Sequence, residues 1–403
     1  MIARRVDHWM FESFALTPRS LGVSRILIGT YLVLYRAPEL SWIGSLPDSL
    51  FRPPPGPMRV IGGIPSSGVM TALSVTLSVA TVALLVGNHT RLASCVTGVL
   101  LFVVDGFAYS FGHVHHSGTF LAAVLVIMSA SNWGAAYSVD ALRRREGVEP
   151  LTQAWPVALA ALLLGFLMLT SALPKLASGW LDPSVLAARA HVVHYRFVAP
   201  HDGLLGALPL ELTNRLVWKP IDYLTLLFEL GFVVAIASPR WTRLFCAAAV
   251  VFHFAVFLAF GIDFTRNVVA YSIFFEWSII TGRLHVPQTA PESAPHLNEP
   301  LKRIRAWIGL AVLLAGVALY LLTEDVGAPI GHLAPRVVTS PNQSATFVVF
   351  VFALPAALAY TMFQTAGATT RFMQRRSKTA PRAESATSRS ASSTGARTES
   401  GGR

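Results

Sequence analysis

The chain has 403 residues, of which 53% are hydrophobic and only 13% are charged, and its mean hydropathy is +0.54. Soluble domains carry about 25% charged residues, so this composition excludes an ordinary soluble protein. The formal net charge of +11 would indicate a nucleic-acid partner in a soluble chain, but here the basic residues lie in short segments between apolar runs and in the C-terminal tail. We therefore expect a polytopic membrane protein of the all-α class, with membrane lipids and not nucleic acid as its surroundings.

The first residues predict a helix at the membrane surface, because residues 3–16 mix charged and aromatic side chains. We assign residues 1–19 to this interfacial segment. Apolar runs long enough to cross a bilayer, roughly 17 to 25 residues, then recur along the chain. They predict about nine to ten transmembrane helices, near residues 20–36, 66–87, 91–112, 117–134, 153–174, 221–238, 242–260, 265–282, 305–323 and 345–363.

The distribution of basic residues predicts the orientation. With a cytoplasmic N-terminus, the "RRR" at 143–145 and the loop 283–304 both lie in the cytoplasm, as the positive-inside rule requires. The C-terminus then also lies inside. We divide the rest of the chain into a transmembrane domain at 20–282, two additional helices within 305–363, and a disordered cytoplasmic tail at 364–403, which becomes rich in serine, threonine and arginine.

Ionisable residues inside the predicted spans are candidates for function, because each costs a few kcal/mol to place in a membrane. On the span 91–112, Asp105, Tyr109 and His113 are four residues apart and share one helix face. The whole set indicates a polar cavity, and the alternative is that its members pair with one another and hold the bundle together. The set consists of Arg25, Asp105, Glu229, His253 and Glu276.

Lys175 ends the predicted span 153–174 on the outer side, and it is one of only four lysines among 32 basic residues. Desolvation lowers the pKa of a lysine, so that its amine can act as a base, which arginine cannot do. Pro174 has no N–H and leaves a helical carbonyl without its donor. The alternative interpretation is a lysine that reaches the interface beside the aromatic anchor Trp180.

Two turns are predicted at the same level as Lys175, "GHVHHS" at 112–117 and "FGIDFTRN" at 260–267. The histidines of the first turn are ligands that suit zinc or copper. Neighbours in one short turn seldom converge on one ion, and no cysteine or acidic side chain nearby completes a ligand set. We therefore expect no metal.

With these residues identified, the sequence resembles a known superfamily, the vitamin K-dependent gamma-carboxylases and the bacterial proteins with the horizontally transferred transmembrane (HTTM) domain. The segment "SALPKLASGWL" matches the family's signature of lysine, leucine, three residues and tryptophan. The resemblance covers about residues 18–282. It is also carried, in the family's order, by "SLGVSRILIGTYLVLYRAPE", "GNHTRLASCV", "HHSGTF", "AAYSVDALRRR", "LFELGF" and "VFHFAVFLAFGIDF".

The resemblance implies a carboxylase-like or quinone-epoxidising enzyme in a bacterial plasma membrane. Lys175 would be the base that deprotonates a reduced menaquinone or a vitamin K-like hydroquinone, His116 would lie on the oxygenation side, and His253 would line the site. The residues assigned to cofactor binding are Arg25, Asp105, Tyr109, Glu229 and Trp180. The acceptor would be a peptide or a lipid at the extracytoplasmic face.

The chain departs from the animal enzymes, which continue into a large lumenal domain that helps to bind a tagged substrate. Here two predicted helices and a polar tail follow instead. Pro174 also stands where those enzymes have a second lysine. A non-enzymatic function therefore stays open, in which the protein is a membrane factor that matures or exports a secreted peptide toxin, as in sporulation-delaying systems. A secreted peptide or a partner subunit would bind in either case.

Overall fold

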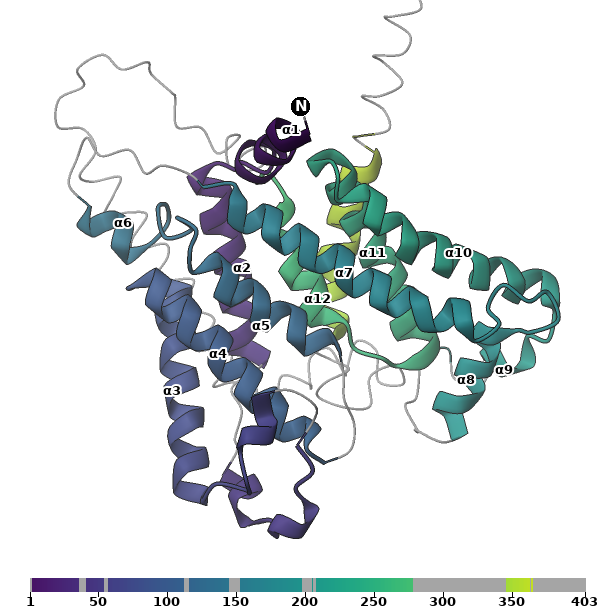
Figure 1. Cartoon of the computed structure of the whole chain (residues 1–403), viewed down its shortest axis with the longest axis horizontal. Coiled ribbons are helices and arrows are strands. Elements are labelled where there is room, and N and C mark those ends of the chain that lie inside the picture. The colour runs from purple at the N-terminus through teal and green to yellow at the C-terminus, as the bar shows by residue number, and fades with distance from the viewer. Residues whose placement is uncertain are drawn as a thin grey trace, which may run out of the picture. The chain divides into compact units, whose positions relative to one another are not determined.

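The computed structural model describes residues 2–35, 41–53, 57–111, 116–144, 153–197, 205, 208–277, 346–362 and 364. These residues form helices and turns, with no β-strand among them, so the all-α class is confirmed for this part of the chain (Figure 1). All contacts reported below lie within the first of two compact units, Met1–Leu358. Within the described ranges, four helices are long and apolar enough to cross a membrane: α3 (Ser67–Val86), α4 (Thr90–Tyr109), α7 (Trp155–Ala177) and α11 (Pro239–Phe260).

The remaining elements connect and surround these four helices. In chain order they are α1 (Ile2–His8), a π-helical turn (Trp9–Ser13), α2 (Pro18–Tyr35), three 3-10 turns (Ser41–Ser45, Asp48–Leu50 and Pro57–Val60), α5 (His116–Met128), α6 (Val139–Arg143), α8 (Ala187–Phe197), α9 (Leu208–Glu211), α10 (Arg215–Ala235), α12 (Thr265–Ala270) and a 3-10 turn (Tyr271–Phe274). A further helix covers residues 346–362. Helix α4 packs on α3 and α5, and α7 packs on α10.

Several predicted spans differ from the helices in the structure. The span 117–134 becomes the shorter α5, and α10 begins at Arg215 and not at residue 221. The span 265–282 is wrong as a single helix, because α12 and the turn after it end at Phe274. Glu276 lies beyond that turn, where its carboxylate accepts hydrogen bonds from the backbone and the hydroxyl of Thr17. The predicted span 305–323 and most of the predicted tail lie outside the described residues.

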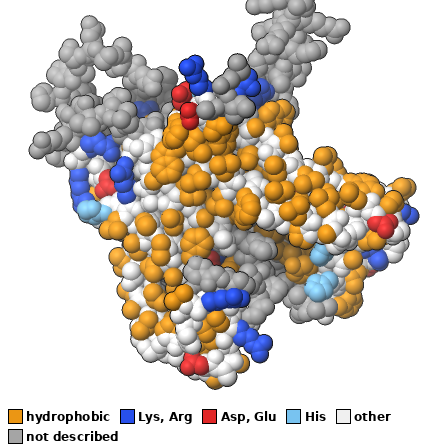
Figure 2. Space-filling model, viewed as in Figure 1, with side chains coloured by type: hydrophobic (Ala, Val, Ile, Leu, Met, Phe, Trp, Pro, Cys, Tyr) orange, Lys and Arg blue, Asp and Glu red, His pale blue; other side chains and the backbone are white. Residues whose placement is uncertain are grey.

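The surface of the helices is apolar, as expected of helices that face lipid. Figure 2 shows hydrophobic side chains covering the faces of α3, α7 and α10, while charged side chains gather around α1 and α6 and at the far end of α10. Exposed hydrophobic side chains on these three helices include Val75, Val79, Phe166, Leu173, Leu224, Leu227 and Val234. Such a continuous apolar surface is unusual for a soluble monomer. The structure is therefore compatible with a membrane protein, while the full number of spans and their orientation stay predictions.

One arginine joins the helices near α6. Arg25 of α2 is fully buried and donates hydrogen bonds to the carbonyls of Leu84 (2.6 Å), Leu85 (2.5 Å), Tyr137 (2.5 Å) and Trp133 (3.3 Å). The first two belong to the last turn of α3, where the Leu84 carbonyl also accepts the Gly87 N–H at 3.1 Å and where helix ends need additional donors. We call this arrangement the Arg25 clamp.

Asp140 of α6 completes the same region by capping α4. Its carboxylate accepts hydrogen bonds from the N–H groups of His89 (2.9 Å) and Thr90 (2.7 Å) and from the Thr90 hydroxyl (2.6 Å). Gly87 stands between the clamp and this cap with φ of 71°, and a Cβ there would overlap Ser138 and come within 3.0 Å of Arg25. Glycine is required at this position for both its conformation and its size.

Candidate functional site

The last turn of α7 forms an ion pair with α10. The Lys175 ammonium donates to both carboxylate oxygens of Glu229, at 2.5 and 2.8 Å, and to the carbonyl of Ser171 at 3.2 Å. The Glu229 side chain is 7% exposed and that of Lys175 is 23% exposed. Two of the predicted site residues, from helices far apart in the sequence, therefore meet directly.

Trp180, a third predicted site residue, lies over this pair. The chain turns at Gly179, whose φ is 82°, and the Trp180 N–H donates to the carbonyl of Lys175 at 3.4 Å. The Lys175 ammonium lies 5.5 Å from the centroid of the Trp180 ring, within the range of a cation–π interaction. The predicted lysine and tryptophan of the signature are thus in contact, and the lysine is bonded to Glu229.

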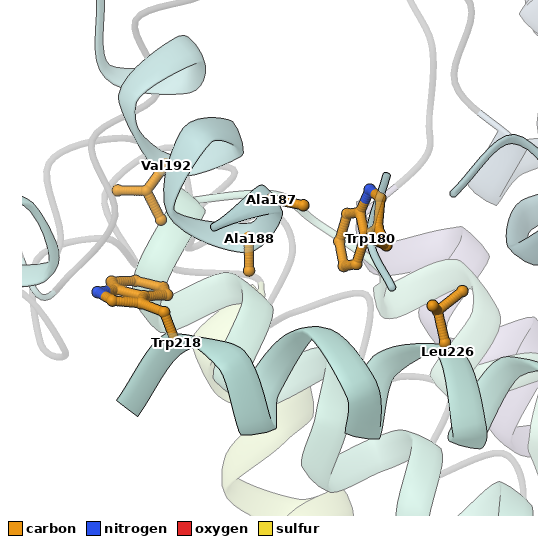
Figure 3. Packing of buried hydrophobic residues seen from close by; sticks show 6 residues of the cluster. All are labelled: Trp180, Ala187, Ala188, Val192, Trp218 and Leu226. Atoms are coloured by element: carbon orange, nitrogen blue, oxygen red, sulfur yellow. The ribbon is translucent and has the colours of Figure 1, made fainter. Parts of the chain in front are cut away.

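The Trp180 ring belongs to a small apolar cluster between α8 and α10. Figure 3 shows it on one side of the first turn of α8 and Trp218 on the other, with Leu226 of α10 nearby. The other members of the cluster are Ala187, Ala188 and Val192. This packing buries Trp180 to 6% exposure. The tryptophan is therefore an internal contact of the protein and not an anchor at the lipid interface.

The ring of His191 on α8 packs against the ring of Trp180 at a tilt of 43°, with 5.6 Å between the ring centroids. Partial burial lowers the pKa of His191 below its ordinary value, and the nearby charges of Lys175 and His194 lower it further, while Asp222 acts in the opposite direction. His191 was not among the site residues predicted from the sequence. The structure adds it to the group around Lys175.

Lys219 and Asp222 of α10 form a second buried ion pair, 3.0 Å apart. The Lys219 ammonium also donates to the carbonyls of Trp180 (2.7 Å) and Val185 (2.9 Å). Asp222 accepts from the N–H groups of Ala187 and Ala188, at 3.2 and 2.8 Å, in the first turn of α8. We call this pair the Lys219–Asp222 latch. Sequence reasoning missed it, although the rarity of lysine and the i, i+3 spacing of the two residues were a usable signal.

His253 lies in a separate aromatic group. Its side chain is 3% exposed, its Nε2 lies 3.0 Å from the hydroxyl of Tyr271, and its ring stacks on Phe264 with 4.4 Å between centroids. Its Nδ1 has no hydrogen-bond partner among the described residues. Phe252, next to it in sequence, packs on Phe228, the neighbour of Glu229, at 5.0 Å between centroids. His253 and Glu229 therefore stand at similar levels of adjacent helices, although Lys175 is not among the contacts of His253.

Asp105 pairs with an arginine from the predicted outer turn 260–267. Arg266 of α12 donates to the Asp105 carboxylate at 2.5 Å. Gly118 of α5 lies directly against this pair, because a Cβ at that position would overlap both charged groups and would come within 2.9 Å of the Tyr109 hydroxyl. Asp105 and Tyr109 thus lie together on one face of α4. Arg266 was not predicted as a site residue, because the sequence places it in a turn.

The other predicted residues have different outcomes. Arg25 donates its hydrogen bonds to backbone carbonyls of the described residues, so a structural role accounts for it, and cofactor binding there stays a prediction. His116 begins α5, but its side chain lies outside the described residues, as do His113 and His115 entirely. Within the described ranges no group of three or more histidine, cysteine or acidic side chains is arranged to hold a metal ion.

Comparisons with family models, curated proteins and solved structures give no match for this chain. The geometry around Lys175 is therefore the main guide to function.

Proposed function

We propose that the chain is a multi-pass protein of a bacterial plasma membrane and uses the Lys175–Glu229 pair for acid–base chemistry at the outer end of its helices. The enzyme would be like the vitamin K-dependent gamma-carboxylases, taking a reduced isoprenoid quinone and oxygen to modify a peptide or a lipid. The observation that carries the proposal is the two-oxygen contact between Glu229 and a lysine at the end of an apolar helix.

A lysine paired with a carboxylate differs from a permanently charged arginine, because a proton can move within the pair. Transfer of a proton from the Lys175 ammonium to the Glu229 carboxylate, 2.5 Å away, would leave a neutral amine beside a carboxylic acid. A hydroxyl that reaches the pair can give its proton to whichever member is basic at that moment. The pair therefore supplies a base without leaving an isolated charge in the membrane.

The surroundings suit a hydroquinone with an apolar tail. Trp180 offers an aromatic face beside Lys175, Glu229 offers an acceptor for a hydroxyl, and the exposed side chains of Leu173 and Leu176 continue the apolar surface of α7. The bound group would supply an acidic hydroxyl and the electrons that reduce oxygen. The buried Nδ1 of His253 is a further hydrogen-bonding group that nothing in the described chain uses.

The experiment compares wild type with Lys175→Arg and Glu229→Gln in lipid nanodiscs supplied with reduced menaquinone and oxygen. Lys175→Arg keeps the charge, the ion pair and the contact with Trp180, but its side chain does not lose a proton. We expect quinone epoxide, detected by mass spectrometry, from the wild type, and at least a hundredfold less from both variants. The melting temperature of Lys175→Arg should match that of the wild type.

Lys378→Arg, the same substitution in the predicted tail, is the matched control and should keep full activity. Epoxide formation by Lys175→Arg at the wild-type rate would overturn the assignment of Lys175 as the base. A folded wild type that forms no epoxide would remove the quinone chemistry from the proposal.

The second candidate is a non-enzymatic factor for the maturation or export of a secreted peptide toxin. It is favoured by the fact that Lys175 is fully engaged by Glu229, Ser171 and Trp180, which joins α7, α10 and the segment between α7 and α8. In that case Lys175→Arg should support normal toxin secretion from cells, because the ion pair is retained. Loss of secretion in this variant would exclude a purely structural lysine.

A further inference from the structure

Two lysines contact Trp180, one at its indole ring and the other at its backbone carbonyl. The Lys175 ammonium lies 5.5 Å from the ring centroid, and the Lys219 ammonium lies 2.7 Å from the carbonyl oxygen. Lys219 also binds the carbonyl of Val185, so one ammonium fixes both ends of the segment that leads from Trp180 toward α8. The position of the ring over Lys175 thus depends on a residue that does not touch Lys175.

Asp222 fixes the next part of the chain. Its side chain has no exposure, and its carboxylate accepts two N–H groups of the first turn of α8 as well as the Lys219 ammonium. These N–H groups have no partners within their own helix, so the carboxylate caps α8 and also neutralises Lys219. Helix α8 therefore begins at a place set by α10.

The same face of α10 carries the partner of Lys175. Lys219, Asp222, Leu226 and Glu229 follow at intervals of three, four and three residues, which places them on one side of a helix. Leu226 packs in the cluster that contains Trp180. One face of α10 thus carries Glu229, which is bonded to Lys175, and also Lys219, which holds the backbone of Trp180.

We propose that Lys219 and Asp222 are positioning residues, which hold Trp180 and α8 as a cover over the Lys175–Glu229 pair. The effect of these two residues on activity rests on the proposed function. Their effect on the placement of α8 does not depend on it. A buried ion pair of this kind is often replaceable by apolar side chains without loss of stability. The directed bonds from the latch to the Trp180 carbonyl and to the first turn of α8 are what apolar side chains would not reproduce.

The position of α8 is read from the titration of the His191 ring by NMR, with the resonance assigned through His191→Gln. The full chain is labelled in its histidines and studied in nanodiscs. The groups that act on His191 are Lys175 of α7, His194 of α8 and Asp222 of α10, and the largest effect on its pKa is partial burial, which lowers it. Release of α8 from Trp180 would reduce this burial.

We expect the pKa of His191 to rise toward its ordinary value in both Lys219→Met and Asp222→Ala. Asp222→Ala is the more discriminating variant, because the charge of Asp222 itself raises the pKa of His191. If α8 does not move, removal of that charge would lower the pKa of His191, and only release of α8 would raise it. Lys219→Arg keeps the donors and should titrate like the wild type. Lys219→Gln replaces Lys219→Met if the methionine variant does not fold.

Wild-type titration of His191 in a folded Lys219→Met or Lys219→Gln protein would overturn the positioning role. In the quinone assay, we expect the rate of epoxide formation to fall at least tenfold in Lys219→Met and to recover in Lys219→Arg. A wild type without quinone activity would refute the proposed function alone, because the His191 titration decides the role of the latch independently.

Discussion

Two cations, the buried Arg25 and the partly exposed Lys175, hold different parts of this molecule by different chemistry. Arg25 has no exposure and donates only to backbone carbonyls, which carry no charge and accept no proton at ordinary pH. Lys175 is 23% exposed and is paired with a carboxylate. The first arrangement fixes loops in place, whereas the second joins two ionisable side chains. We propose acid–base chemistry for the second arrangement alone, because a backbone carbonyl does not take a proton from its partner.

The largest effect is expected from removing the Arg25 clamp. Arg25→Met leaves the carbonyls of Leu84, Leu85, Tyr137 and Trp133 without this donor, and each buried group left unpaired costs about 1 to 3 kcal/mol. We expect a loss of about 4 kcal/mol or more in the free energy of unfolding, measured by thermal unfolding in detergent. Arg91→Met is the control, because Arg91 is exposed and its guanidinium donates a hydrogen bond to the side chain of Asn132 and not to buried carbonyls. Equal melting temperatures for the two variants would contradict the clamp.

A smaller effect is expected at the Lys175–Glu229 pair, where both partners can be removed together. Lys175→Met leaves Glu229 buried without its partner and should lose about 3 kcal/mol, and Glu229→Leu should lose less, because the more exposed Lys175 can reach water. The double variant should be more stable than Lys175→Met and should still form no quinone epoxide. Additive losses, measured by thermal unfolding of all four proteins, would show that the two residues do not interact.

The apolar helices and several of their buried ionisable residues could be predicted from the sequence. The spans at α3, α4, α7 and α11 follow from uninterrupted apolar length, and burial of Arg25, Asp105, Glu229 and His253 follows from their position inside such runs. Apolar length was misleading at 265–282, where the helical structure ends at Phe274 and Glu276 bonds to Thr17 of the segment before α2. That contact depends on how distant segments meet, which hydropathy does not encode.

The partners of the predicted residues were harder to find than the residues themselves. Glu229 was identified, but its pairing with Lys175 depends on the relative placement of α7 and α10. Lys219 and Asp222 lie at the start of the predicted span 221–238 and Arg266 lies in the predicted turn 260–267, so the i, i+3 spacing of the first two was the available signal in the sequence. Only the three-dimensional arrangement shows that each of them is bonded inside the protein.

The smallest effect is a difference in pH dependence between the two regions. Burial alone would raise the pKa of Asp140, but the bonds from the Thr90 hydroxyl and from the N–H groups of Thr90 and His89 lower it more, so it lies below the ordinary 3.8. Its stabilisation is complete above pH 3.8 and is lost as the pH falls through the lower value of the folded protein. The pKa of His191 is also lowered, from 6.5, so its contribution is complete above pH 6.5 and is lost as the pH falls below that value.

Acidification should therefore weaken the contact of α8 with Trp180 well before it weakens the Asp140 cap of α4. Between pH 7.5 and 5.5, we expect the melting temperature of the wild type to fall by about 2 °C or less, and that of His191→Gln to fall by less than the wild type. Asp140→Asn should follow the wild type over this range and lose its difference from the wild type only near and below pH 4, where the wild-type carboxylate is itself protonated. An equal fall in melting temperature for His191→Gln and wild type between pH 7.5 and 5.5 would mean that the ring of His191 is not held against Trp180. The contact of α8 with Trp180 would then be no stronger at neutral pH than in acid.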